Sequence, residues 1–226
     1  HVGGDVRPGA AHAALQSATM PVTDSARPPE PDSTAPTARR PAAVLIPIFP
    51  TPEGPHVVVI RRTARGRHAG QHAFPGGRPE PEDADLQATA LREAHEEVGI
   101  DPAGVTIVAA LPVVETIVTN YAISAFVGLL DRRPNMVAQP DEVAEILEVP
   151  LAALMADGLP LVEEWDLPLP GEPWTTPASD ATPEQRRRTI RYYPWRDHQI
   201  WGATARMIEH LARALRDGRV IVPGNI

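Results

Sequence analysis

Two β-branched runs separated by a short turn constrain the fold of this chain most. The runs are Ala42–Phe49 (AAVLIPIF) and His56–Arg61 (HVVVIR), and the segment 51–55 between them contains two prolines and a glycine. Apolar runs of this kind, bounded by turn-forming residues, indicate strands, and their short separation indicates a β-hairpin. The folded part of the chain is therefore expected to begin near Pro41, with a sheet.

The rest of the chain alternates between strand-like and helix-like segments. Leu86–Val98 has helical apolar spacing, and Gln199–Arg216 repeats apolar residues at steps of three or four from Trp201 onward. This spacing places Trp201 on the apolar face of a helix, which favours a place in the core over the alternative, a contact with a ligand. Further strands are expected at Val105–Val114, Tyr121–Leu130 and Thr189–Tyr193, with a short helix near Leu151–Met155 after the segment 140–150. The mixed order predicts an α/β fold, an α/β/α sandwich.

Proline is distributed unevenly and suggests the domain boundaries. Residues 1–40 are rich in Pro, Ala, Ser and Thr and hold almost no large apolar residues, so they are expected to form a flexible tail. A folded domain is expected over residues 41–217, with a long surface loop at 163–187 and a short C-terminal tail at 218–226. A neighbouring subunit that holds the N-terminal tail, in a homodimer, is the alternative.

Composition excludes several classes of function. The chain contains no cysteine and no lysine, which excludes thiolate metal sites, cysteine nucleophiles and lysine-based phosphate loops or Schiff bases. A net charge of −8 argues against nonspecific binding to nucleic acid. No apolar stretch is long enough to suggest a membrane span or a signal peptide, so a cytoplasmic location is expected.

The charges between residues 54 and 97 are segregated by sign. Residues 54–79 hold five arginines and no acid, and residues 80–97 hold seven acids and one arginine, Arg92. One interpretation is a phosphate-binding surface beside a cation-binding surface. The other is a pair of solvated faces of opposite charge. The five arginines are Arg61, Arg62, Arg65, Arg67 and Arg78.

Helical geometry favours the first interpretation. Glu93, Glu96 and Glu97 lie at i, i+3 and i+4, which places all three carboxylates within about 100° of one helix face. Like charges at this spacing repel one another, and a divalent cation relieves the repulsion. Mg²⁺ and Mn²⁺ prefer such oxygen ligands and often share them with substrate phosphates. A solvated acidic helix remains the alternative at this point.

The loop before this helix supports a ligand site. Its Phe74-Pro-Gly-Gly77 segment contains two glycines, Gly76 and Gly77, which allow a sharp turn and a close approach of the backbone to a ligand. Asp83 precedes the helix and can reach Arg92, which would tie the loop to the helix with a charge-assisted hydrogen bond. Gly99 is the expected C-cap of the helix.

These residues together resemble a known motif. The pattern Gly77-x5-Asp83-x8-Arg92-Glu93-Ala94-x-Glu96-Glu97-x-Gly99-Ile100 resembles the box of Nudix hydrolases. An Asp at position 83 and one extra residue before Arg92 are features of the coenzyme A pyrophosphatase branch. The segments Arg67–Gln71, Ala73–Gly77 and Ile200–Ala205 are also similar to that branch, and the resemblance extends over about residues 41–216.

The resemblance implies a fold, a cofactor and roles for individual residues. The fold would be a Nudix-type α/β/α sandwich with a mixed β-sheet. Glu93, Glu96 and Glu97 would bind Mg²⁺ or Mn²⁺. The expected catalytic residues are Glu96, Arg92, Asp83 and Glu142, and the expected substrate-binding residues are Arg61, Arg62, Arg67, Phe74, Gly76 and Gly77.

Several assignments around this set stay open. Glu142 is the first candidate for general base, with Glu145 second and Glu115 third. His68 and His72 are expected to have structural roles in the loop. The run Arg186–Arg188 is either solvated or in contact with a 3′-phosphate of the substrate.

The function implied is metal-dependent hydrolysis of the diphosphate of coenzyme A or its thioesters, to 3′,5′-ADP and a phosphopantetheine product. Among enzymes, the alternative is hydrolysis of ADP-ribose, dinucleotides or nucleoside triphosphates. The alternative of another class is a non-catalytic nucleotide-binding regulator of the same fold. The expected partner is thus a nucleotide-derived small molecule, with no nucleic acid and no membrane.

Overall fold

The computed structural model describes residues 38–64, 70–116, 119–166 and 187–223. Over these residues an eight-stranded mixed sheet contains the path β3-β2-β1-β7-β5, with β4 paired to β1, β6 to β7 and β8 to β2. A separate sheet has the order β11-β10-β9. The strands of the large sheet are β1 (Arg40–Thr51), β2 (Gly54–Arg62), β3 (His72–Ala73), β4 (Gly76–Gly77), β5 (Thr106–Ala110), β6 (Val114–Glu115), β7 (Tyr121–Leu129) and β8 (Val143–Pro150).

The predicted N-terminal hairpin is present. β1 and β2 pair antiparallel, with Thr51 opposite Gly54 beside the turn. On its other edge β1 pairs parallel with β7, from Arg40 opposite Tyr121 to Ile48 opposite Leu129. Because β1 has neighbours on both edges, it forms the buried centre of the sheet, and eight of its consecutive residues, 42–49, are buried.

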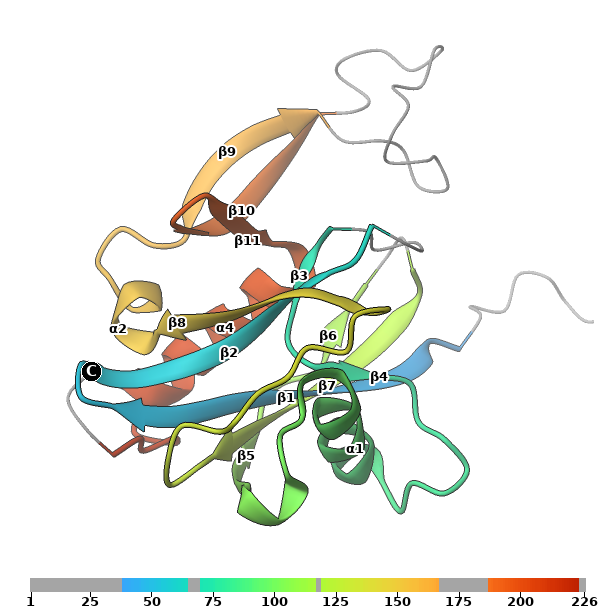
Figure 1. Ribbon diagram of the computed structural model, residues 1–226. Coiled ribbons are helices and arrows are strands. Elements are labelled where there is room, and N and C mark those ends of the chain that lie inside the picture. Colours follow the sequence, from blue (N-terminus) through green and yellow to red (C-terminus); the bar gives the residue numbers. More distant parts are fainter. Residues whose placement is uncertain (1–37, 65–69, 117–118, 167–186, 224–226) are drawn as a thin grey trace, which may run out of the picture. The chain divides into compact units, whose positions relative to one another are not determined.

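Helices cover the two faces of the sheet, as Figure 1 shows. Val58 and Ile60 of β2 face α1 (Leu86–Val98) within one hydrophobic cluster. Val57 and Val59 face the other way, into a cluster with α4 (Gly202–Arg216) and the short α2 (Leu151–Leu154). The alternation of strand side chains produces the two apolar layers, and the predicted α/β/α sandwich with a mixed sheet is confirmed.

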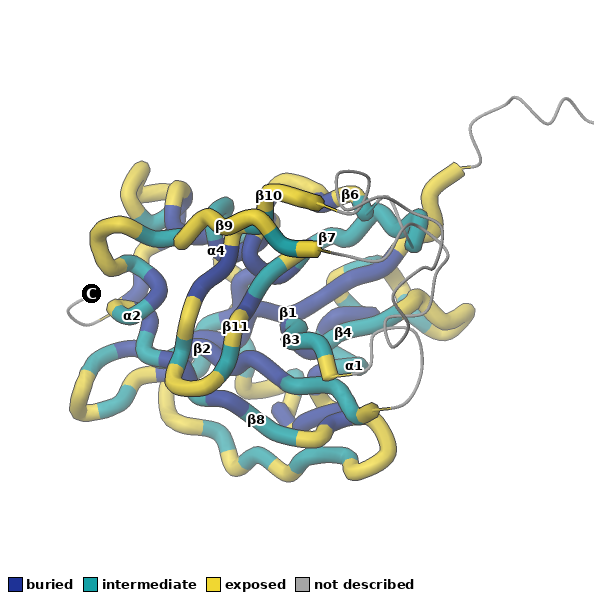
Figure 2. The backbone as a smooth tube through the Cα atoms, turned by 90° about the horizontal axis from the view of Figure 1, so that it is seen from above, coloured by how far each residue is buried: buried dark blue, intermediate teal, exposed yellow. Residues whose placement is uncertain are grey.

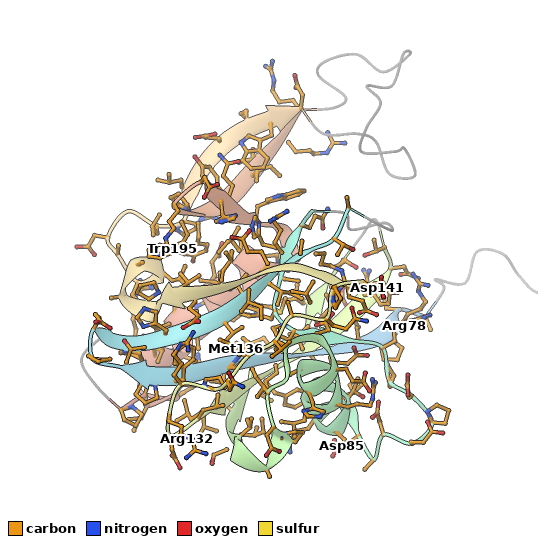
Figure 3. All side chains as sticks on the ribbon, viewed as in Figure 1. Arg78, Asp85, Arg132, Met136, Asp141 and Trp195 are labelled. Carbon is orange, nitrogen blue, oxygen red and sulfur yellow. The ribbon has the colours of Figure 1, made fainter. Side chains whose placement is uncertain are left out.

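Helix α1 begins and ends at specific caps. Asp85, labelled in Figure 3, is the N-cap, and its Oδ1 accepts a hydrogen bond from the backbone N–H of Ala88 at 2.8 Å. Gly99 is the C-cap with φ of 74°, a left-handed conformation that favours glycine. Both bounds agree with the sequence prediction, so the register of the acidic face is fixed by local signals.

The C-terminal part differs from the sequence prediction. Residues 161–166 form β9 (Leu161–Asp166), and it pairs with β10 (Arg187–Trp195), so both ends of the expected surface loop lie in strands. The interior of that loop, 167–186, and the expected tail over 1–37 lie outside the described residues. β8 is a strand that the sequence analysis did not assign, and it adds to the free edge of β2.

Trp201 also differs. It ends β11 (His198–Trp201), opposite Tyr192 of β10, and α4 starts one residue later at Gly202. The prediction of a helical Trp201 in the core is therefore wrong, because strand pairing with β10 takes precedence over the apolar spacing. Figure 2 shows β11 beside β3 in the view from above. No described helix has the length and apolarity needed to cross a bilayer.

Candidate active site

The centre of the site is a buried carboxylate. Glu97 is 2% exposed, and its Oε2 accepts a hydrogen bond from the backbone N–H of Gly76 at 2.9 Å. Its Oε1 accepts one from Arg62 Nη1 at 3.2 Å. Burial raises the pKa of Glu97 to about 7, with the negative charges of Glu93 and Glu142 adding to the increase against the effects of Gly76 and Arg62. Helix α1 and strands β2 and β4 thus meet at one carboxyl group.

The other two glutamates of the acidic face contact Arg92. Arg92 Nη1 lies 3.2 Å from Glu93 Oε1 and 2.9 Å from Glu96 Oε2. The Glu93 side chain is 16% exposed and that of Glu96 is 56% exposed. Burial raises the pKa of Glu93, opposed by Arg92. Solvent exposure on the acidic face therefore increases from Glu97, which is buried, through Glu93 to Glu96, which is solvated.

Asp83 holds Arg92 from the loop side. Arg92 donates from Nε to Asp83 Oδ1 and from Nη2 to Asp83 Oδ2, both at 3.0 Å. Asp83 also accepts from the backbone of Glu80 and from the Thr89 hydroxyl. The Arg92 hydrogen bonds hold the pKa of Asp83 well below its usual range, and Asp83 in turn raises the pKa of Arg92. The contact predicted between loop and helix is present as a bidentate pair.

Neighbouring atoms approach the two glycines of β4 so closely that neither position has room for a side chain. A Cβ on Gly76 would lie 2.2 Å from the Ala43 carbonyl oxygen, and one on Gly77 would lie 2.3 Å from Glu93 Oε1. Only a residue without a side chain lets β4 pair with β1 while Glu93 packs against it. The glycine turn thus brings a backbone N–H and two carboxylates together.

Glu142 reaches this cluster from the segment before β8. It is exposed, and its charge contributes to the raised pKa of both Glu93 and Glu97. Its backbone carbonyl accepts from the N–H of Thr63, which fixes the segment beside the end of β2. An exposed acid beside buried carboxylates is suited to exchange protons with solvent.

The donor set has the chemistry that a divalent cation requires. Glu93 and Glu97 supply hard carboxylate oxygens on one helix face, and burial penalises their charge in the absence of a positive partner. In the structure Arg62 and Arg92 supply the positive charge. Within the described ranges, no three carboxylate or imidazole groups converge on one point where they could share an ion. The carboxylates therefore fit Mg²⁺ or Mn²⁺ by the type of their donor atoms, and in the structure they form ion pairs with arginines.

The two neighbouring arginines of β2 lie on opposite faces of the sheet. Arg62 turns to Glu97, on the side of α1, whereas Arg61 Nε donates to Glu145 Oε2 at 3.0 Å on the other side. The pairing of β2 with β8 shifts register between these residues. Arg61 and Glu145 therefore leave the acidic cluster and line a cavity of about 800 Å³ between the two sheets.

Two histidines meet in this cavity. His72 Nε2 lies 3.1 Å from His198 Nδ1, and His198 Nε2 lies 3.7 Å from Glu145 Oε1. Burial, followed by the charge of His198, lowers the pKa of His72. His72 and His198 are 126 residues apart in the chain. The sequence analysis identified neither His198 nor the cavity, since their proximity depends on the packing of β11 against β3.

The remaining candidates lie away from the acidic cluster or outside the described residues. Phe74 is 1% exposed and packs in the hydrophobic core, which argues against the substrate contact expected for its side chain. Glu115 pairs with Arg39. Arg187 and Arg188 begin β10. Three further candidates, Arg65, Arg67 and His68, lie outside the described residues, as does Arg186.

Comparison with known proteins identifies the family. The model of the NUDIX domain matches residues 38–168, which is more than half of the chain and contains the whole acidic cluster. The chain belongs to the Nudix family. The Nudix hydrolase NudL of Pectobacterium atrosepticum, described as uncharacterized, is 36% identical over 181 residues, covering 79% of this chain and 84% of that protein. NudL of Citrobacter koseri is 37% identical, covering 77% and 82%.

Solved Nudix structures are more distant. The hydrolase RenU of M. smegmatis has 23% sequence identity and a TM-score of 0.44, covering 50% of this chain and 71% of RenU. Membership of the Nudix family makes this chain a hydrolase of phosphoric anhydride bonds in nucleotide-derived substrates, within a family that typically depends on divalent metals.

Proposed function

We propose that this Nudix hydrolase cleaves the diphosphate of coenzyme A or its thioesters, releasing 3′,5′-ADP and phosphopantetheine or its acyl form. The observation that carries the proposal is the bidentate Asp83–Arg92 pair. Asp83, one position of the box in which this chain follows the coenzyme A branch, anchors the arginine that contacts two of the three glutamates. A residue typical of the coenzyme A branch, Asp83, thus holds the arginine that contacts the acidic face, which supports this substrate class.

In this proposal Glu93 and Glu97 are the main ligands of the cation, and Glu96 completes the set. Bound Mg²⁺ or Mn²⁺ would polarise the diphosphate and lower the pKa of the attacking water. Asp83 and Arg92 keep loop and helix in register, so that the Gly76 N–H and the Glu97 carboxylate keep their relative positions. Such pre-organised charge is the main source of catalysis in phosphoryl transfer.

Glu142 is proposed as the general base. Its exposed carboxylate contributes to the raised pKa of Glu93 and Glu97, and in this proposal it accepts the proton of the water that attacks phosphorus. Glu145, the second candidate, is paired with Arg61 on the opposite face, which argues against it. Glu115 pairs with Arg39 in a separate part of the sheet. The packing therefore favours the first of the three candidates.

A substrate panel tests the proposal. Coenzyme A, ADP-ribose, NADH and dGTP are each incubated with the chain and Mg²⁺ or Mn²⁺, and products are resolved by mass. We expect coenzyme A to give the highest kcat/KM, with 3′,5′-ADP as a product. Intact coenzyme A beside turnover of another compound would overturn the substrate assignment. No turnover of any compound, with binding retained, would favour a non-catalytic regulator.

A further inference from the structure

We propose that the cavity between the two sheets binds a phosphate monoester on the nucleoside end of the substrate, and that Arg196 is its specificity-determining contact. The inference rests on the proposed function for the reaction itself, but it assigns residues outside the Nudix box. The cavity lies on the face of β2 away from α1, and its described lining includes Arg61, Glu145, Arg196, His198 and Trp201. Its volume, about 800 Å³, is that of a typical small-molecule site.

The backbone at Arg196 gives the first argument. Trp195 pairs with His198, so Arg196 and Asp197 form a two-residue hairpin turn, beside the Trp195 labelled in Figure 3. Arg196 has φ of +52°, the left-handed region that glycine normally occupies at the first turn position. A non-glycine residue there costs about 1 kcal/mol. Such strain at the mouth of a cavity points to a functional side chain.

Charge gives the second argument. Arg61 is paired with Glu145, whereas Arg196 forms no ion pair with any described residue, and its guanidinium carbon lies 5.4 Å from the centroid of the Trp195 ring. Its guanidinium therefore keeps its hydrogen-bond donors for a ligand. Arginine forks match phosphate oxygens in bidentate geometry.

A histidine pair links β3 to β11 at the cavity. His72 Nδ1 contacts the Gln199 carbonyl at 3.1 Å, and because a carbonyl only accepts, this nitrogen carries the proton. His72 Nε2 then accepts from His198 Nδ1, and His198 Nε2 faces Asp197 Oδ1 at 3.4 Å and Glu145. The described lining thus holds two arginines, Arg61 and Arg196, and two carboxylates, Glu145 and Asp197, and of the arginines only Arg61 is in an ion pair with a described residue.

The distance to the acidic cluster allows one molecule to reach both places. His72 lines the cavity, and Gly76, four residues later, contacts Glu97. Four extended residues span at most about 14 Å, which a nucleotide carrying both a diphosphate and a further phosphate can cover. Arg61 and Arg62, adjacent in β2, contact the cavity and the cluster respectively.

Coenzyme A and dephospho-coenzyme A differ only in this phosphate monoester and test the proposal directly. We expect Arg196→Ala to lower kcat/KM for coenzyme A by about 10-fold or more, the effect of one charged hydrogen bond, and to leave dephospho-coenzyme A within about twofold. Arg196→Gly should show the same selectivity loss with an equal or higher Tm, because glycine relieves the strained φ. Arg191→Ala is the control, since Arg191 lies in β10 but pairs with Glu209 and does not line the cavity.

Equal slowing of both substrates, or no change for either, would overturn the role of Arg196. If the natural chain leaves coenzyme A intact, the proposed function is wrong. The cavity proposal is then tested separately, by measuring the binding of nucleotides. Calorimetry then compares 3′,5′-ADP with 5′-AMP. We expect about 10-fold tighter binding of 3′,5′-ADP, with the difference abolished by Arg196→Gly, and equal binding of the two nucleotides would overturn the proposal.

Discussion

At the scale of single residues, the site depends on one buried carboxylate, that of Glu97. Glu97 is held by one backbone N–H and one arginine, and both contacts favour its charged form while burial opposes it. A cation beside Glu97 and Glu93 would remove that opposition. Removing the charge of Glu97 is therefore expected to lower activity and to raise the stability of the metal-free protein.

Glu97→Gln keeps the shape of the side chain and removes one ligand charge. We expect turnover of the preferred substrate to fall by several orders of magnitude, because the charged oxygen is lost from the cation site. Glu53→Gln, in the exposed turn between β1 and β2, is the matched control and should keep full activity. Steady-state kinetics with Mg²⁺ checks this, and near-normal turnover in a folded Glu97→Gln protein would refute the role.

Stability should move in the opposite direction in the metal-free protein. The folded-state pKa of Glu97, about 7, lies above its ordinary value of 4.5, so folding retains a proton that the unfolded chain releases between these values. The free-energy cost of burying the charged Glu97 carboxylate is absent below pH 4.5, grows as the pH rises and is complete above about pH 7. Above about pH 7, the free energy of unfolding of the Glu97→Gln variant should exceed that of the natural chain by at most about 3 kcal/mol.

Urea unfolding in a chelating buffer at several pH values measures this difference. Its growth between pH 4.5 and pH 7 is the expected result. A difference that stays constant over that range would contradict the raised pKa. Added Mg²⁺ should stabilise the natural chain more than the variant, because only the natural chain binds the ion with a full set of charges.

At the scale of elements, β4 is two residues long, and its two glycines meet different kinds of neighbour. A Cβ at Gly76 meets the backbone of Ala43 and Val44, which cannot move without disrupting the pairing of β1 with β4. A Cβ at Gly77 meets the end of the Glu93 side chain, which can rotate away. The same substitution should thus have two separable effects.

We expect Gly76→Ala to lower the free energy of unfolding by about 3 kcal/mol, from backbone displacement and overpacking. Gly77→Ala should fold with a smaller loss and yet lose most activity, because Glu93 is displaced from its position beside Glu97. Thermal unfolding and kinetics of the two variants, side by side, test this. Similar stability losses in both variants would contradict the difference in their neighbours.

At the scale of the whole molecule, the described residues from Ala38 onward form one compact unit. The composition of the segment 1–37, rich in proline and poor in large apolar residues, predicts that it adds little to folding. A chain that begins at Ala38 should match the full chain in Tm and kcat/KM. Calorimetry and kinetics check this, and a loss of several degrees would show that the segment packs on the domain or joins two subunits.

The sequence by itself determined the parts of the site that lie within one element. Asp85 and Gly99 cap α1, and the i, i+3, i+4 spacing places Glu93, Glu96 and Glu97 on one face, because helical geometry relates residues that are close in sequence. The contact of Asp83 with Arg92 spans nine residues and was predicted for the same reason. The glycines of the turn were also identified from their position before the helix.

Only the tertiary structure decided which distant segments meet. The pairing of β2 with β8 brings Glu145 to Arg61, 84 residues away, which argues against Glu145 as the general base. The pairing of β10 with β11 makes Trp201 a strand residue and places His198 against His72. Strand pairing depends on complementary edges and packing of the whole chain, which no local period records. The acidic helix was therefore predictable, whereas the cavity on the opposite face of the sheet was not.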